Sequence, residues 1–153
     1  MEGEAALPVP RQAEAETLLT VEGLTKHFPV RGGFPIRRTI GQVQAVDGID
    51  LNVRVGESFG LVGESGCGKS TTGRLITRLL EPTAGTITYR GQDIGHAKRR
   101  ELVPIRSEIQ MIFQDPYSSL NPRQTVGKIV SGPMEINGID PAGGREARVR
   151  ELL

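Results

Sequence analysis

Residues 63–70 read Gly-Glu-Ser-Gly-Cys-Gly-Lys-Ser, with glycines, a lysine and a hydroxyl residue at fixed spacing. An apolar run at 58–62 precedes this segment. A helix expected over 70–80 would follow it and bury one face, formed by Leu75, Ile76, Leu79 and Leu80. The order of buried strand, glycine-rich loop and helix is typical of a phosphate-binding loop, and it places the chain in the α/β class.

Each position of this loop suits a nucleoside triphosphate. Glycines let the backbone N–H groups converge on phosphate oxygens, and the following helix directs its positive end at the same anion. Lys69 would contact the β- and γ-phosphates, and the Ser70 hydroxyl is placed to ligate Mg²⁺. A glycine-rich turn with an incidental lysine is the alternative interpretation. The predicted binding residues are Gly63, Glu64, Ser65, Gly66, Cys67, Gly68, Lys69, Ser70 and Thr71.

Composition excludes several other classes of protein. The chain has 153 residues and a net charge of +1, which suits one modest domain and gives no general attraction to nucleic acid. The absence of tryptophan and the few aromatic residues argue against a base-stacking platform for nucleic acid. Apolar runs are too short for a membrane span, and the N-terminus has no signal-peptide pattern. Cys67 is the single cysteine, so an internal disulfide is impossible.

The sequence before the loop predicts a leader and two strands. Residues 1–16 are rich in Ala, Glu and Pro and are expected to form a disordered leader, with one partial domain over 17–153. A first strand is expected at 18–22, continuing loosely to 28, and an exposed loop at 29–41. Apolar and polar residues alternate over 49–55, which predicts a strand with one face in the core.

Further elements are expected after the loop. In order they are a strand at 86–90, a short helix at 98–102 stopped near Pro104, a strand at 109–113, and helices at 125–131 and 144–153. The last helical pattern has no capping glycine or closing strand after it, which indicates a fragment.

Four stretches together carry a resemblance to a known family. They are His-Phe-Pro-Val-Arg-Gly-Gly at 27–33, Gln-Ala-Val-Asp-Gly-Ile at 44–49, the loop and its continuation at 63–73, and Ile-Phe-Gln-Asp-Pro-Tyr-Ser-Ser-Leu-Asn-Pro-Arg at 112–123. The chain resembles the ATP-binding cassette (ABC) family, and more narrowly the second ATPase subunit of oligopeptide and dipeptide importers. The resemblance implies a P-loop NTPase core with an N-terminal antiparallel β subdomain, truncated before the signature motif and the Walker B strand.

The resemblance also implies roles for residues outside the loop. Phe28 matches the aromatic residue that stacks on adenine, although an ordinary core phenylalanine is the alternative. Gln114 matches the glutamine that helps to ligate Mg²⁺ and the attacking water, so Lys69 and Gln114 are the catalytic candidates. The segment 115–123 would receive a coupling helix of a transmembrane subunit, unless it is simply a solvated loop.

Parts of the family's hydrolysis machinery have no match in the sequence. These are the Leu-Ser-Gly-Gly-Gln-type signature, the apolar strand ending in Asp, the adjoining catalytic Glu and the switch His. We therefore expect the 153 residues to bind ATP and Mg²⁺ without efficient turnover. The core sheet is likewise expected to leave apolar faces uncovered.

For function, the resemblance implies an ATP-binding subunit of a peptide importer at the cytoplasmic face of the membrane. Its partners would be transmembrane permease subunits and a second ATPase subunit in a head-to-tail nucleotide sandwich. The alternatives are a catalytically incomplete ATP-binding fragment with no transport role, and an ABC-type ATPase outside transport. Because Cys67 lies inside the loop, we also predict that thiol alkylation blocks nucleotide binding and that Mg-ATP protects.

Overall fold

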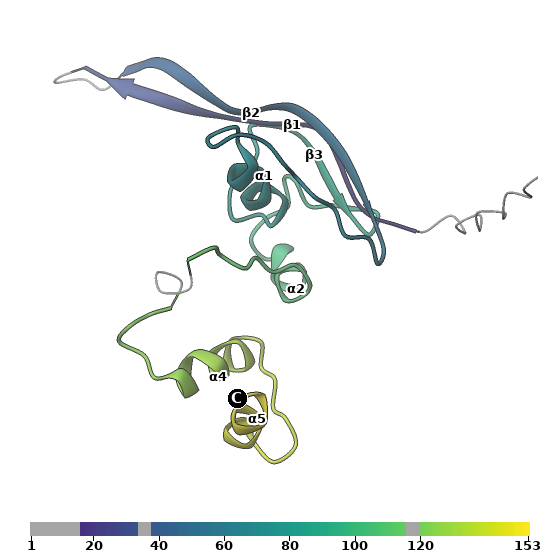
Figure 1. The fold of residues 1–153 in the computed structure, drawn as a ribbon, viewed down its shortest axis with the longest axis vertical. Coiled ribbons are helices and arrows are strands. Elements are labelled where there is room, and N and C mark those ends of the chain that lie inside the picture. Colours follow the sequence, from purple (N-terminus) through teal and green to yellow (C-terminus); the bar gives the residue numbers. More distant parts are fainter. Residues whose placement is uncertain (1–15, 34–37, 116–119) are drawn as a thin grey trace, which may run out of the picture. The chain divides into compact units, whose positions relative to one another are not determined.

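The computed structural model describes residues 16–33, 38–115 and 120–153 (Figure 1). They form two compact units, one reaching Val103 and the other covering Pro104–Leu153, and each is described by itself. The predicted leader at 1–16 lies outside the described residues, apart from Glu16.

The first unit contains a four-stranded antiparallel sheet. Its strands are β1 (Thr17–Gly32), β2 (Arg38–Arg54), β3 (Ala84–Tyr89) and β4 (Gln92–Asp93), in the order β2-β1-β3-β4. The expected alternation along β2 is confirmed, since Ile49, Leu51 and Val53 are partly buried while the residues between them are exposed. An N-terminal antiparallel β subdomain is therefore present.

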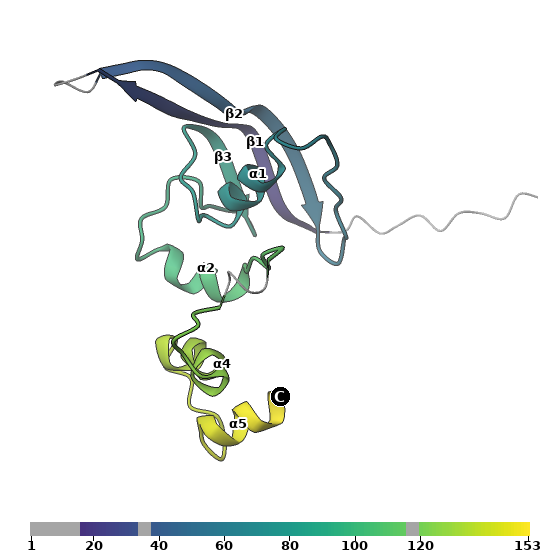
Figure 2. The same ribbon diagram turned by 60° about the vertical axis from the view of Figure 1, so that its left-hand side comes forward.

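β1 and β2 form a hairpin that is longer than expected. Pairing continues to Gly32 opposite Arg38, so the prediction of a loop over 29–41 is wrong for 29–32 and 38–41. β3 pairs with β1 only as far as Thr25, and the hairpin extends beyond it (Figure 1 and Figure 2). Pro29 is tolerated here because β1 has a partner on one side only, so its missing N–H can fall on the open edge.

Helix α1 (Lys69–Ile76) packs against one face of this sheet (Figure 1 and Figure 2). The core between them contains aliphatic side chains that include Val21, Leu24, Leu75 and Ile87. α1 ends earlier than the predicted residue 80, because Arg78 takes a left-handed φ of 54°. The buried Arg78 guanidinium donates to the carbonyl oxygens of Ile94 (2.7 Å), Leu80 (3.1 Å) and Ala97 (3.4 Å). Leu79 is consequently exposed, contrary to the prediction.

Two predicted strands are not formed. Segments 58–62 and 109–113 have no strand structure, and Val62 and Ile112 are 91% and 97% exposed. A strand needs hydrogen-bonding neighbours, and the sheet of the described residues is bounded by β2 and β4, with neither segment paired to it. Phe59 and Leu61 are about half exposed and Val62 is almost fully exposed, in line with the expectation of uncovered apolar faces.

Within residues 94–115 and 120–153, the structure describes three helices: α2 (Leu102–Glu108), α4 (Val126–Ile136) and α5 (Arg145–Leu152). The prediction of a helix at 98–102 ending near Pro104 is wrong, because Pro104 lies in the first turn of α2, where its missing N–H costs little. The helices expected at 125–131 and 144–153 are confirmed, with α4 running further to Ile136. α4 begins after Thr125, whose hydroxyl accepts from the Lys128 N–H at 3.3 Å.

Candidate functional site

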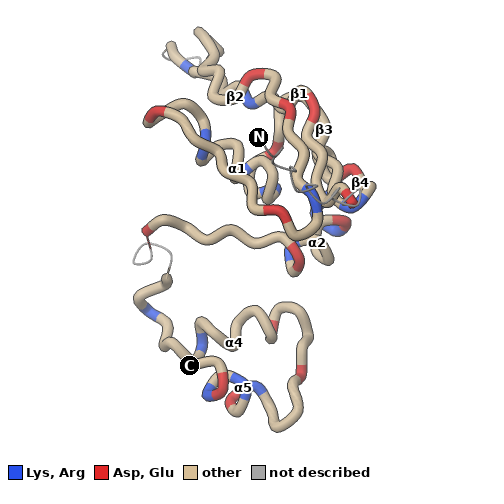
Figure 3. Tube along the Cα trace, turned by 45° about the vertical axis from the view of Figure 1, so that its right-hand side comes forward, with Lys and Arg blue, Asp and Glu red and all other residues tan. Residues whose placement is uncertain are grey.

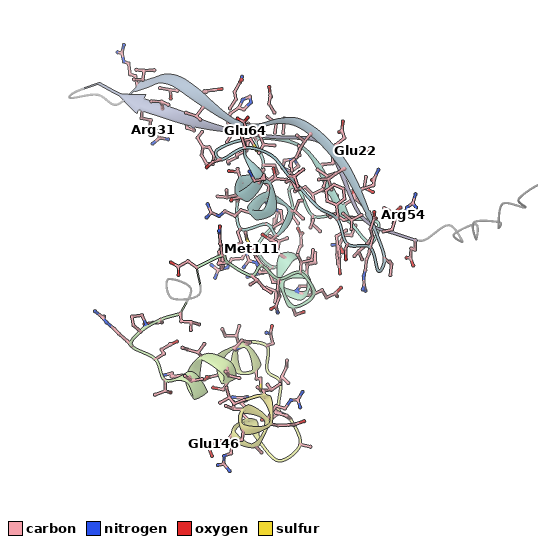
Figure 4. The ribbon with its side chains drawn as sticks, in the orientation of Figure 1. Glu22, Arg31, Arg54, Glu64, Met111 and Glu146 are labelled. Atoms are coloured by element: carbon pink, nitrogen blue, oxygen red, sulfur yellow. The ribbon has the colours of Figure 1, made fainter. Side chains whose placement is uncertain are left out.

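The glycine-rich loop closes around the side chain of Lys69. The Lys69 ammonium donates to the carbonyl oxygens of Gly63 and Glu64 at 2.7 and 2.6 Å, and Cys67 Sγ lies 3.6 Å from it. Glu64 marks the position of the loop beside the sheet and α1 (Figure 4). The loop therefore already encloses a charged group at the place where the sequence predicts phosphates.

Glycine is required at the end of this loop. Gly68 is the N-cap residue of α1 and has a φ of 97°, which side chains rarely allow. A Cβ atom on Gly68 would also overlap the backbone carbonyl oxygen of Ala45 on β2. The loop can therefore lie directly against the sheet, which fixes the start of α1.

The N-terminus of α1 is suited to an anion. It has no side-chain cap and no acidic residue in its first turn, so its N–H groups are not claimed by a local carboxylate. The Thr72 hydroxyl donates back to the Gly68 carbonyl oxygen at 3.1 Å. Ser70 is exposed in this first turn, and Thr71 follows it half-buried. The arrangement fits a phosphate group held by Lys69 and helix N–H groups.

The residues present also fit a nucleotide-bound Mg²⁺. Among the described residues, no three His, Cys, Asp or Glu side chains are grouped as a metal site. Mg²⁺ in nucleotide sites needs only one or two protein oxygens, because phosphates and waters supply the others. The exposed Ser70 hydroxyl, next to Lys69, is suitable as one such ligand.

Phe28 and the loop both lie beside the same stretch of β2. It pairs with Val43 on β2, two residues from Ala45, against which Gly68 packs. Two residues along a strand span about 7 Å. The structure thus brings Phe28 and the loop to one stretch of β2, and Phe28 is 37% exposed. Stacking on adenine remains a prediction.

Lys26, which contacts this ring, was not among the binding or catalytic residues predicted from the sequence. The Lys26 ammonium lies 5.3 Å from the centroid of the Phe28 ring and donates to the Glu81 carbonyl oxygen at 2.6 Å. In the sequence, one signal indicates this contact: Lys26 and Phe28 are two residues apart in a strand, so their side chains lie on the same face of the sheet.

Gln114 belongs to the second unit and is exposed in a segment without helix or strand structure. Its predicted roles as an Mg²⁺ ligand and catalytic residue stay predictions. The proposed docking segment 115–123 lies partly outside the described residues, which omit 116–119.

An apolar cavity of about 410 Å³ adjoins the loop. It reaches Lys69 and Ser70 and is lined on its other sides by β2, α1 and the segment before the loop: Leu51, Val53, Phe59, Leu61, Thr72, Gly73 and Ile76. The α1 side of the phosphate loop is therefore open to an apolar neighbour.

Comparison with known proteins identifies the family. The sequence profile described as "ABC transporter" matches residues 46–153, which is more than half of the chain. The chain belongs to the ABC transporter family. An oligopeptide transport ATP-binding protein, AppF of Bacillus subtilis, is 44% identical over 92% of this chain and 43% of its own length. The glutathione import ATP-binding protein GsiA of Salmonella typhimurium is 46% identical over 92% of this chain and 22% of its own length.

Solved structures show the same fold. The ATP-binding cassette MJ0796, in a dimeric post-hydrolysis state with ADP and Pi, superposes with a TM-score of 0.70 at 25% identity, covering 88% of this chain and 55% of the other. The chain spans less than half the length of the importer proteins it matches. In the part of the chain that the structure describes, every helix is too short or too polar to cross a bilayer.

Proposed function

We propose that residues 63–71 bind the triphosphate of ATP. The closed loop around the Lys69 ammonium, at an uncapped helix N-terminus, is the observation that carries this proposal. When a triphosphate enters, its oxygens would replace the Gly63 and Glu64 carbonyls as partners of Lys69, and such charge-assisted bonds are stronger than neutral ones. Ser70 would hold Mg²⁺, and the Phe28 ring would stack on adenine.

The protein to which this cassette belongs would import oligopeptides or dipeptides. The relatives named as oligopeptide transport and peptide ABC transporter ATP-binding proteins support this, at 44% and 47% identity. Glutathione, which is also a peptide, is the cargo in the names of other relatives. Transmembrane permease subunits would dock on 115–123 at the cytoplasmic face of the membrane.

A second ATPase subunit would complete the nucleotide site. The dimeric state of the similar MJ0796 cassette supports a pair of such subunits, which we propose to be arranged head-to-tail. Gln114 would then contribute to the Mg²⁺ ion and the attacking water. Hydrolysis needs these groups in addition to the phosphate cradle, so the 153 residues alone should bind ATP and release phosphate only very slowly.

Calorimetric titration of the chain with Mg-ATP tests the binding site. Lys69→Met should reduce the affinity at least about tenfold, because hydrogen bonds to charged groups contribute about 1.5–3 kcal/mol. Lys98→Met removes an exposed lysine elsewhere and serves as the matched control, with affinity unchanged. The proposal is wrong if Mg-ATP does not bind the unsubstituted chain, or if Lys69→Met binds it equally well.

Peptide uptake tests the transport role separately. Cells that carry Lys69→Met in the corresponding gene should accumulate labelled oligopeptides only at background rate, whereas cells with Lys98→Met should match the parent strain. Normal uptake by the Lys69→Met strain, with ATP binding lost in vitro, would exclude an energising role for this site.

A further inference from the structure

Lys26 connects the Phe28 ring to the segment that follows α1. Its ammonium lies 5.3 Å from the ring centroid, within the range of a cation–π contact. The same ammonium donates to the Glu81 carbonyl oxygen at 2.6 Å. Glu81 comes five residues after α1 ends at Ile76. One charged group therefore contacts both the ring and the backbone of the segment beyond the phosphate-loop helix.

The ammonium restricts how a planar base can approach the ring. A cation over one face of a benzene ring occupies that face, so a purine must stack on the opposite one. Phe28 as a residue is 37% exposed, so part of its surface remains accessible to a ligand. The hydrogen bond to the Glu81 carbonyl oxygen holds the ammonium in place beside the ring.

We propose that Lys26 is a positioning residue for the adenine base, which it directs to one face of Phe28. This inference rests on the proposed function, in which Phe28 stacks on the adenine of ATP. Lys26 itself makes no contact with the phosphates in this scheme. Its contribution should therefore depend on the base and on the Phe28 ring, and not on the triphosphate.

A double-mutant cycle with two ligands measures that dependence. Calorimetry gives the affinity for two ligands, Mg-ATP and Mg-tripolyphosphate, of which the second has no base. It is carried out on the unsubstituted chain, Lys26→Met, Phe28→Leu and the double variant. Lys26→Met should weaken Mg-ATP binding about two- to fivefold, the size of a cation–π contact near the surface. Phe28→Leu should weaken it about tenfold, as expected for loss of base stacking. Tripolyphosphate affinity should stay constant throughout.

The decisive result is whether the effect of Lys26→Met on Mg-ATP affinity depends on the Phe28 ring. In the Phe28→Leu background, Lys26→Met should cause no further loss, and Lys26→Arg should retain the affinity of the unsubstituted chain, because arginine also makes cation–π contacts. Arg90→Gln is the matched control: Arg90 lies 5.5 Å from the Tyr89 ring, a second cation–π pair in the same sheet, and its removal should leave both ligands unaffected.

Each remaining outcome contradicts the inference in a distinguishable way. Equal weakening of both ligands in Lys26→Met would show that the contact with Glu81 only maintains the fold. A loss that persists in the Phe28→Leu background would separate Lys26 from the ring. If the unsubstituted chain binds tripolyphosphate as tightly as ATP, the base contact does not exist although the phosphate site does. If it binds neither, the proposed function fails as well.

Discussion

The antiparallel sheet and segment 58–62 are both rich in aliphatic and aromatic residues, but only the sheet is packed. Val21 in β1 and Leu75 in α1 are almost fully buried, whereas Leu61 and Val62 face solvent. The difference is the availability of partners: β1 has neighbours on both sides over part of its length, and segment 58–62 pairs with no strand of the described residues. The phosphate loop joins the two regions. Its α1 end is held against β2, and its other end continues into the unpaired segment 58–62.

Leucine truncation should show the largest contrast between the two regions. Leu75→Ala removes a fully buried side chain and should lower the free energy of unfolding by about 2–5 kcal/mol. Leu61→Ala, at a residue that is 46% exposed, should change it by less than about 1 kcal/mol. Urea titration followed by circular dichroism measures both. Equal losses would mean that segment 58–62 is packed in solution.

Glycine substitution should distinguish the α1 end of the loop from the segment that precedes the loop. Gly68→Ala forces a Cβ onto the Ala45 carbonyl at a positive φ, a strain of about 1–3 kcal/mol that should weaken Mg-ATP binding about tenfold or more. Gly60→Ala has open space around the added methyl group and should bind normally. Calorimetric titration gives both affinities. Tolerance of alanine at residue 68 would contradict the close contact between loop and β2.

A polar contact within the sheet should give the smallest effect. The Asp50 carboxylate accepts a hydrogen bond from the Gly23 N–H at 2.6 Å, where β1 bends with a φ of 58°. Asp50→Ala should reduce the free energy of unfolding by about 0.5–1.5 kcal/mol. Asn52→Ala, exposed two residues along β2, is the control and should have almost no effect. If both variants match the parent in urea titration, this bond adds nothing to the sheet.

Local patterns predicted the elements whose partners lie close by. The alternation over 49–55 identified β2, and the glycine and lysine spacing identified the loop that surrounds Lys69. The prediction of a buried strand at 58–62 was wrong. An apolar run shows that a segment can be buried, but not that neighbouring strands are present to pair with it. The same reasoning also missed the long hairpin, since Pro29 and Gly32 suggest a loop unless the strand has a free edge.

Local sequence patterns also do not predict contacts between residues that lie far apart in the sequence. Arg78 falls on the polar face of the helix expected over 70–80, but it is buried because three backbone carbonyls accept from its guanidinium. Lys26 could be placed on the face of Phe28 by spacing, whereas its anchor on Glu81 depends on the turn after α1. Acidic and basic residues are interspersed along α5 (Figure 3), and Arg150 is paired with Glu146 at 3.4 Å.

Reactivity of Cys67 tests whether the loop around Lys69 receives the phosphates of ATP. Cys67 is the single cysteine of the chain, it is exposed, and its Sγ lies 3.6 Å from the Lys69 ammonium. Alkylation of the thiol should be slowed strongly by Mg-ATP and much less by Mg-AMP, and Lys69→Met should need at least about tenfold more Mg-ATP for the same protection. If Cys67 reacts at the same rate with and without Mg-ATP, or if the alkylated chain binds Mg-ATP normally, the phosphates do not bind at this loop.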